Sequence, residues 1–285
     1  MTWKQYIKKY LGLLCLRPFR VLGTEESLRT LLESGKSFAR IGDGEFHLIL
    51  QNHALGFQQA DDLLSRRLRQ VLEEPIPECW VGVPDTVAYY RNLTDESESF
   101  WAEYMYETCR HWRRLLRRDV TYLAANVTRP YIRHRDRSVS KGYFDLLKQL
   151  WAGKDLLIVE GEQTVLGVGN DLFAGAASVK RILCPARNAF GCYEQILQAA
   201  MTHGAGKLIL IALGPTATVL AYDLAKAGFY GVDIGHIDVE YEWFCMGARE
   251  RVRLKNRFVN ETEGGSETEK TDDPTYWSQI VDRIG

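Results

Sequence analysis

Short apolar runs alternate with longer amphipathic segments along most of this 285-residue chain. The short runs are rich in β-branched and aromatic residues, whereas the longer segments repeat apolar residues at the three- and four-residue spacing of a helix face. Strands are predicted over residues 37–41, 79–83, 120–125, 156–160, 181–184, 208–213 and 232–234. Helices are predicted over residues 61–74, 100–116, 139–151, 193–201 and 216–227.

The order of these elements favours a parallel sheet. Strands that are joined by helical crossovers run in the same direction, and the helices then cover both faces of the sheet. The runs LLIVEG (156–161) and LILIALG (208–214) carry apolar residues on both faces, as strands covered from both sides do. The sequence therefore predicts an α/β, Rossmann-like fold with a largely parallel sheet of about seven strands.

The two ends of the chain differ from the main domain, which is predicted over residues 23–260. Residues 1–22 are predicted to form an amphipathic basic helix with one apolar face, made of Trp3, Tyr6, Ile7, Tyr10, Leu11 and Leu14. That face can pack on the chain's own domain or a sister subunit, or residues 1–20 can dock on a membrane surface or a partner. Residues 261–285 are predicted as an acidic linker and a short C-terminal helix that docks back or onto a second subunit.

Composition narrows the classes of partner and compartment. The 36 Lys and Arg residues balance 37 Asp and Glu residues, so no overall charge points to nucleic acid. The six cysteines form no CxxC pair, which suits thiols in a reducing cytosol. No apolar run approaches the ~20 residues of a spanning helix, and no signal-peptide pattern opens the chain. We therefore expect a cytoplasmic protein, which the N-terminal helix can hold at the inner face of the membrane.

Candidate chemistry follows the first predicted strand, where Gly42-Asp43-Gly44-Glu45 leads into a helical run. Ligands of open parallel sheets bind beyond the carboxyl ends of the strands. Glycines on both sides of Asp43 allow a ligand to approach closely, and the two carboxylates can be aimed at one divalent cation. The structural alternative is that Asp43 caps the helix and Glu45 favours its N-terminal dipole.

A glycine-containing turn follows the strand at 156–160. Its Gly167, Gly169, Asn170 and Asp171 can cradle a phosphate with backbone amides, although the turn is neither a dinucleotide fingerprint nor a Walker A loop. The alternative is an ordinary strand-to-helix turn.

Further polar residues stand at other strand ends. Arg187 and Asn188 follow the fifth strand, Thr216 follows the sixth, and Arg129 follows the third. The two arginines suit an anionic ligand, and capping of the next helix is the favoured role of Thr216.

The last predicted strand ends in a cluster of titratable residues, His236, Asp238, Glu240 and Glu242. Titratable side chains at a strand end are candidates for general acid–base chemistry, so this cluster is the favoured source of a general base. Structural roles for His236 and solvated positions for the two glutamates are the alternatives.

Taken together, FARIGDGEF, VEGE with GVGNDLF, CPARNAF, LGPTATVLAYDLAKAG and DIGHIDVEYEWF resemble the bacterial glycosyltransferases of the GT-D fold, over residues 25–247. The resemblance implies a UDP-sugar donor, a divalent metal that is typically Mn²⁺ with Mg²⁺ possible, and transfer of glucose or a related hexose to a surface glycan or glycoprotein.

The resemblance also implies roles for individual residues. Asp43 and Glu45 match the family's D-x-E motif for the metal and the nucleotide sugar, and one acid of the 238–242 group would act on the acceptor hydroxyl. The expected donor-binding set is Gly42, Asp43, Gly44, Arg129, Gly167, Gly169, Asn170, Asp171, Arg187, Asn188, Thr216 and His236. The alternatives are a nicotinamide oxidoreductase, whose fingerprint is missing, and a non-catalytic nucleotide-binding assembly module.

Overall fold

The computed structural model describes residues 1–51, 54–257, 259, 262, 265 and 271–285. Their centre is a nine-stranded sheet with the order β1-β4-β3-β2-β8-β7-β5-β6-β9, and every pairing among these strands is parallel. The strands are β1 (Arg20–Val21), β2 (Ser37–Arg40), β3 (Cys79–Val83), β4 (Thr121–Ala124), β5 (Asp155–Gly161), β6 (Ser178–Cys184), β7 (Leu208–Ala212), β8 (Tyr230–Asp233) and β9 (Ile280–Arg283).

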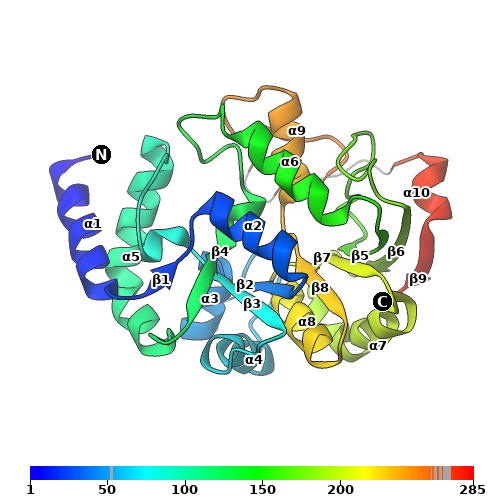
Figure 1. The fold of residues 1–285 in the computed structure, drawn as a ribbon, viewed down its shortest axis with the longest axis horizontal. Helices are drawn as coiled ribbons and strands as arrows, with labels where there is room; N and C mark the ends of the chain where they lie inside the picture. Colours follow the sequence, from blue (N-terminus) through cyan, green and yellow to red (C-terminus); the bar gives the residue numbers. More distant parts are fainter. Residues whose placement is uncertain (52–53, 258, 260–261, 263–264, 266–270) are drawn as a thin grey trace.

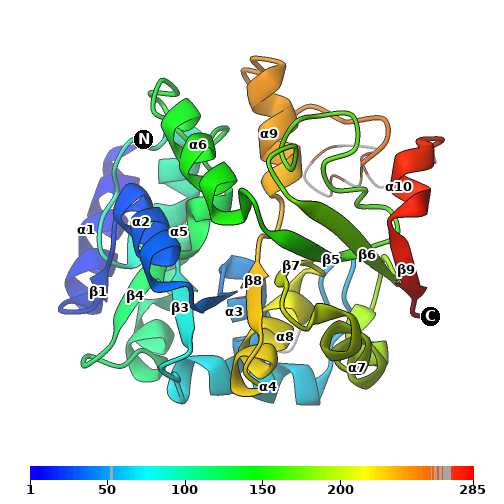
Figure 2. The ribbon, with the colours of Figure 1, turned by 45° about the vertical axis from the view of Figure 1, so that its right-hand side comes forward.

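Helices pack on both faces of this sheet (Figures 1 and 2). One face is covered by α3 (Asp43–Gln51), α4 (Asp62–Glu73), α5 (Asp95–Leu115), α7 (Tyr193–Gly204) and α8 (Pro215–Lys226). The other face is covered by α2 (Thr24–Ser34), α6 (Ser140–Trp151) and α9 (Ile237–Cys245). Helix α1 (Trp3–Leu16) packs on α5, and α10 (Pro274–Ser278) precedes β9.

The strand β5 illustrates why the sheet is covered on both sides. Leu157 and Val159 lie in one core cluster, whereas Leu156 and Ile158 lie in the other. Successive side chains of a strand point to opposite faces, so a run that is apolar throughout must be covered twice. The predicted fold class is confirmed, with nine strands instead of seven.

The two additional strands lie at the edges of the sheet. β1 pairs with β4 through Arg20 and Val21, and β9 pairs with β6. The prediction of a helix throughout the C-terminal segment is wrong for Ile280–Arg283, because the open edge of β6 supplies hydrogen-bonding partners there: the Ile284 amide donates to Leu183 at 2.8 Å. Most of the predicted acidic linker lies outside the described residues.

Candidate active site

A pocket of about 630 Å³ opens at the carboxyl ends of the central strands. Its walls come from the segments that follow β2, β4, β5, β6, β7 and β8, and from the first turns of α5. Both the location and the volume are typical of small-molecule sites in open α/β sheets. The polar lining comprises Arg40, Asp43, Glu45, Gln58, Glu96, Ser97, Asn126, Arg129, Arg133, Thr164, Asn188, His236, Asp238 and Arg251.

Asp43 and Glu45 stand in the first turn of α3, on the pocket wall. The Gly42 amide donates to Glu45 Oε2 at 2.8 Å, and the Phe46 amide donates to the Gly42 carbonyl at 3.1 Å. A glutamate at this position that reaches back to the amide before the helix forms half of a capping box. Phe46 is fully buried and stacks on Trp112 with ring centroids 3.6 Å apart, which holds the start of α3 in place.

A buried ion pair lies beside this turn. Arg40 Nη2 is 2.7 Å from Asp233 Oδ1, and Arg40 Nε donates to the Asp233 carbonyl at 3.0 Å. Gly235 makes room for the guanidinium, because a Cβ at this position would lie 2.1 Å from Arg40 Nη2. Gly235 also has a φ of 46°, which L side chains rarely adopt. Arg40 therefore lines the pocket while its guanidinium is paired with Asp233.

The pKa of the Glu45 carboxyl group is raised. Burial raises its pKa from 4.5 to about 7, and the Asp233 carboxylate adds to the rise while Arg40 opposes it. A divalent cation at Asp43 and Glu45 would offset this penalty by favouring the ionised form. Among the described residues no group of three or more His, Cys, Asp or Glu gathers as a metal site. The pair thus fits a cation that takes its other ligands from a diphosphate and water, as Mg²⁺ commonly does.

Replacing Glu45 by Gln is expected to stabilise the protein at pH 8 but not at pH 5. A carboxyl pKa that folding raises makes stability fall as pH rises from about 4.5 through about 7, because the folded state must lose a proton that it holds more tightly. The shift corresponds to at most roughly 3 kcal/mol at alkaline pH. Urea unfolding at the two pH values measures the effect, with the exposed Glu73→Gln as control; an equal change at both would contradict it.

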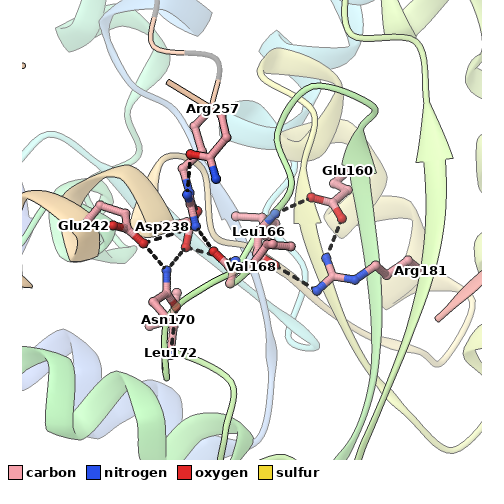
Figure 3. A network of polar contacts seen from close by, with 11 residues as sticks. Glu160, Leu166, Val168, Asn170, Leu172, Arg181, Asp238, Glu242 and Arg257 are labelled. Atoms are coloured by element: carbon pink, nitrogen blue, oxygen red, sulfur yellow. Dashed lines mark hydrogen bonds and ion pairs between the residues drawn. The ribbon is translucent and has the colours of Figure 1, made fainter. Parts of the chain in front are cut away.

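The turn after β5 is held by a buried ion pair between Glu160 and Arg181 (Figure 3). The Leu166 amide donates to Glu160 Oε2 at 2.7 Å, and Arg181 Nη2 donates to the Leu166 carbonyl at 2.8 Å. Val165 has a φ of 42°, a costly conformation for a β-branched residue. The ion pair thus fixes both the amide and the carbonyl of Leu166, the residue that follows Val165. It thereby holds Thr164 and Leu166 on the pocket wall.

A second network fixes the GVGNDLF part of the turn (Figure 3). Asp238 Oδ1 accepts from the Gly167 amide at 3.0 Å and from Asn170 Nδ2 at 2.9 Å, while its Oδ2 pairs with Arg257 Nε. Asn170 Nδ2 also donates to Glu242 Oε1 at 2.6 Å. The same Glu242 oxygen lies 3.2 Å from Arg257 Nη2. Asn170 and two of the predicted acids therefore lie together, around an arginine that the sequence analysis did not single out.

The other predicted acids have different surroundings. Glu240 is fully buried and accepts from the Tyr131 and Ile132 amides, each at 3.0 Å. Asp171 is mostly exposed, pairs with Lys148 at 2.8 Å and accepts from the Tyr241 hydroxyl. Asp238 is the member of the 238–242 acid group that lines the pocket.

The structure brings part of the predicted donor-binding set to the pocket. Gly42, Asp43, Gly44, Arg129, Asn188 and His236 line it. Gly167, Gly169, Asn170, Asp171, Arg187 and Thr216 lie outside the lining. Arg187 is exposed. Thr216 is fully buried inside α8, whose N-cap is Gly214, so the prediction that Thr216 caps this helix is wrong: Pro215 takes the first helical position and starts the helix one residue earlier.

The sequence analysis missed several lining residues. Arg133 is buried, with Nη2 2.9 Å from Asp85 Oδ1, and Asn126 Nδ2 donates to the same oxygen at 3.2 Å. Arg251 reaches the lining from beyond α9 and pairs with Glu96 at 2.6 Å. The arginine run 133–137 and the segment after α9 resemble solvated surface in the sequence, so only the chain path reveals them. Arginines and a carboxylate pair that line one pocket suit a diphosphate with a cation.

A parallel α/β sheet with a pocket at the carboxyl ends of its strands is typical of proteins that bind small-molecule ligands. Residues 38–262 match the family described as "Glycosyltransferase GT-D fold". The chain belongs to this family, and the resemblance inferred from its motifs is confirmed.

Individual relatives agree with this assignment. The chain is 42% identical over 266 residues to a probable glycosyl transferase, Gly, of Streptococcus gordonii, and 39% identical to the glycosyltransferase GlyD of Streptococcus pneumoniae. These alignments cover 93% of the chain but only 39% and 32% of the two relatives, so the chain spans two fifths or less of their length.

Solved structures extend the similarity to the whole fold. A domain of unknown function 1792, reported to have a distinct glycosyltransferase fold, matches with a TM-score of 0.91 and 37% identity over 99% of this chain and 100% of that one. A glycosyltransferase of the same domain type from Streptococcus sanguinis matches with a TM-score of 0.90 and 42% identity over 94% of this chain and 100% of that one.

Proposed function

We propose that the chain transfers a hexose, glucose or a close relative, from a UDP-sugar to a hydroxyl group of a glycan or glycoprotein acceptor. The observation that carries the proposal is that one pocket is lined by the Asp43–Glu45 pair and by arginines from two other segments, Arg129 and Arg133 after β4 and Arg251 after α9. Both a cation held by carboxylates and arginine side chains stabilise a nucleoside diphosphate leaving group, because its charge grows as the bond to the sugar breaks. Family membership favours this activity over a nicotinamide oxidoreductase or a non-catalytic assembly module.

Asp43 and Glu45 would hold a divalent cation, Mn²⁺ or Mg²⁺. When bound, the cation would supply Lewis-acid stabilisation of the diphosphate. Arg129 and Arg133 line the same pocket from the segment after β4 and would bind phosphate oxygens. Phe100, which is half exposed and also lines the pocket, offers an apolar surface to a ring. The six unpaired cysteine thiols support a reducing, cytoplasmic setting.

We assign proton acceptance from the acceptor hydroxyl to Asp238, since it is the acid of the 238–242 group that lines the pocket. Its Oδ2 has an acceptor position beyond the bond to Arg257, which a hydroxyl can use. Transfer that is lost in Asp238→Asn and kept in Glu242→Gln supports the assignment, whereas the reverse result moves the role to Glu242.

Thermal unfolding with a panel of nucleotides tests the donor class. UDP and UDP-hexoses with Mn²⁺ are expected to raise the melting temperature by several degrees, because a ligand of the folded state stabilises by mass action. ADP and NADH are expected to give much smaller shifts. A larger shift with NADH, or equal shifts with and without the metal, would refute the proposal.

A further inference from the structure

Helix α1 turns its apolar face away from the protein. Trp3 is 77% exposed, Tyr10 is 67% exposed and Leu14 is 64% exposed, and the apolar stripe also includes Tyr6, Ile7 and Leu11. Figures 1 and 2 show α1 at the rim of the molecule, beyond α5. The predicted apolar face of this helix is therefore the one that the described elements leave uncovered.

The opposite side of α1 is attached by specific contacts. A Cβ on Gly12 would lie 3.4 Å from the Met105 backbone, so α1 and α5 pack closely there, and Leu16 is buried. Lys9 pairs with Glu98 at 2.6 Å, and Lys8 pairs with Glu103. Residues 12 and 16 lie on the helix side opposite to 3, 10 and 14, given 3.6 residues per turn. The outward direction of the stripe is thus fixed by packing.

Basic side chains adjoin this stripe, chiefly at the carboxyl end of α1. The first 20 residues contain no Asp or Glu. Lys8 and Lys9 are paired with acids of α5, and the other basic side chains of this segment are Lys4, Arg17 and Arg20. The end of α5 and the turn after it add a basic cluster, made of Arg110, Arg113, Arg114, Arg117 and Arg118. Arg113 Nη1 donates to the Cys15 carbonyl at 2.7 Å, so the cluster adjoins the carboxyl end of α1. An apolar stripe flanked by such charge is complementary to an anionic lipid surface.

The area of the stripe argues against a second copy of the chain as its occupant. A helix of 14 residues is about 21 Å long, and a face about 10 Å wide then covers on the order of 200 Å². Stable protein–protein interfaces bury about 800 Å² on each partner. Trp and Tyr with aliphatic neighbours are instead the residues that settle at the boundary between headgroups and acyl chains.

We propose that α1 binds an anionic membrane surface, with the stripe inserted at the acyl boundary and the basic cluster on the headgroups. Among the residues that the structure describes, no helix is long and apolar enough to cross a membrane. The proposed contact is made by the surface of α1, and it is independent of the proposed transfer reaction.

Co-sedimentation with vesicles tests this proposal. Binding to vesicles of equal parts phosphatidylglycerol and phosphatidylcholine is expected to exceed binding to pure phosphatidylcholine at least about ten-fold, and to weaken as salt rises. Tyr10→Ser combined with Leu14→Ser is expected to lower binding at least about ten-fold. The matched control, Leu63→Ser combined with Met246→Ser, alters two other apolar residues that are more than half exposed and is expected to bind as the unmodified chain does.

Other outcomes overturn the proposal. Equal binding by the stripe variant and the unmodified chain would remove α1 from the contact, and no binding to either vesicle would remove the membrane. A dimer in light scattering that the stripe variant dissociates, without lipid binding, would assign the stripe to a second copy. Unchanged circular dichroism and melting temperature show that each variant is folded, as expected for exposed positions.

Discussion

Replacing Asp43 by Asn is expected to lower kcat/KM for sugar transfer at least about 1,000-fold, because Lewis-acid stabilisation by a bound cation is worth several kcal/mol. Asp43 lines the pocket, and its partner Glu45 is partly committed to the Gly42 amide. An amide at position 43 keeps the shape but removes a negative charge from the proposed cation site. The metal-dependent part of the UDP-induced rise in melting temperature is expected to vanish with it. Steady-state kinetics and thermal unfolding measure the two effects.

A matched control separates the cation site from general electrostatics. Asp145→Asn removes the same charge from the exposed surface of α6, where Asp145 pairs with Lys141, and is expected to leave both measurements unchanged. If Asp43→Asn retained metal-dependent UDP binding and transfer, the cation site would have to lie elsewhere. If it retained binding but lost transfer, Asp43 would act on the reaction and not on donor affinity.

The strands were predictable because their apolar runs are long enough to be recognised without tertiary information. The run of β5 is buried from Leu156 to Gly161, and the sequence prediction lies within one residue of its end. β1 has two residues, and β9 was taken for a helix because its few apolar residues fit either period. Both are formed by hydrogen bonding to a sheet edge, which local sequence does not encode.

The acids of the last motif show how an error in local structure changes a site. The sequence analysis placed Asp238, Glu240 and Glu242 at a strand end, but they lie in α9. On a helix, residues 238 and 242 share a face, whereas residue 240 points some 200° away from 238. Asp238 and Glu242 thus meet at Asn170, while Glu240 turns inward to the Tyr131 amide.

The arginines that support the turn after β5 could not be predicted, because each comes from a different part of the chain. Arg181 lies inside β6, and Arg257 follows α9 by more than ten residues. Neither has a local motif, and each acquires a role only when the sheet order places it beside Glu160 or Asp238. The glycine-rich motif therefore predicted where a turn lies, but not that two buried ion pairs hold it.

Replacing Arg181 by Met is expected to lower the free energy of unfolding by about 3–5 kcal/mol, because it leaves the fully buried Glu160 carboxylate without its counter-charge. It also removes a donor to the Leu166 carbonyl and a hydrogen bond to Gln279 Oε1, 2.7 Å from Arg181 Nε. The loss is expected to be spread over the turn and the β9 edge. Urea unfolding measures it.

Two further comparisons identify the buried charge as the cause. Burial raises the pKa of Glu160 even beside Arg181, so without the arginine the folded state holds a proton more tightly than the unfolded state does. Stability then falls as pH rises, and the loss in Arg181→Met is expected to be larger at pH 8 than at pH 5. Adding Glu160→Gln to Arg181→Met keeps an acceptor for the Leu166 amide. The double variant is expected to regain at least about 2 kcal/mol of the free energy of unfolding at pH 8. A loss that is equal at both pH values, and that the second substitution deepens, would instead assign the effect to packing of the Arg181 side chain on Tyr276.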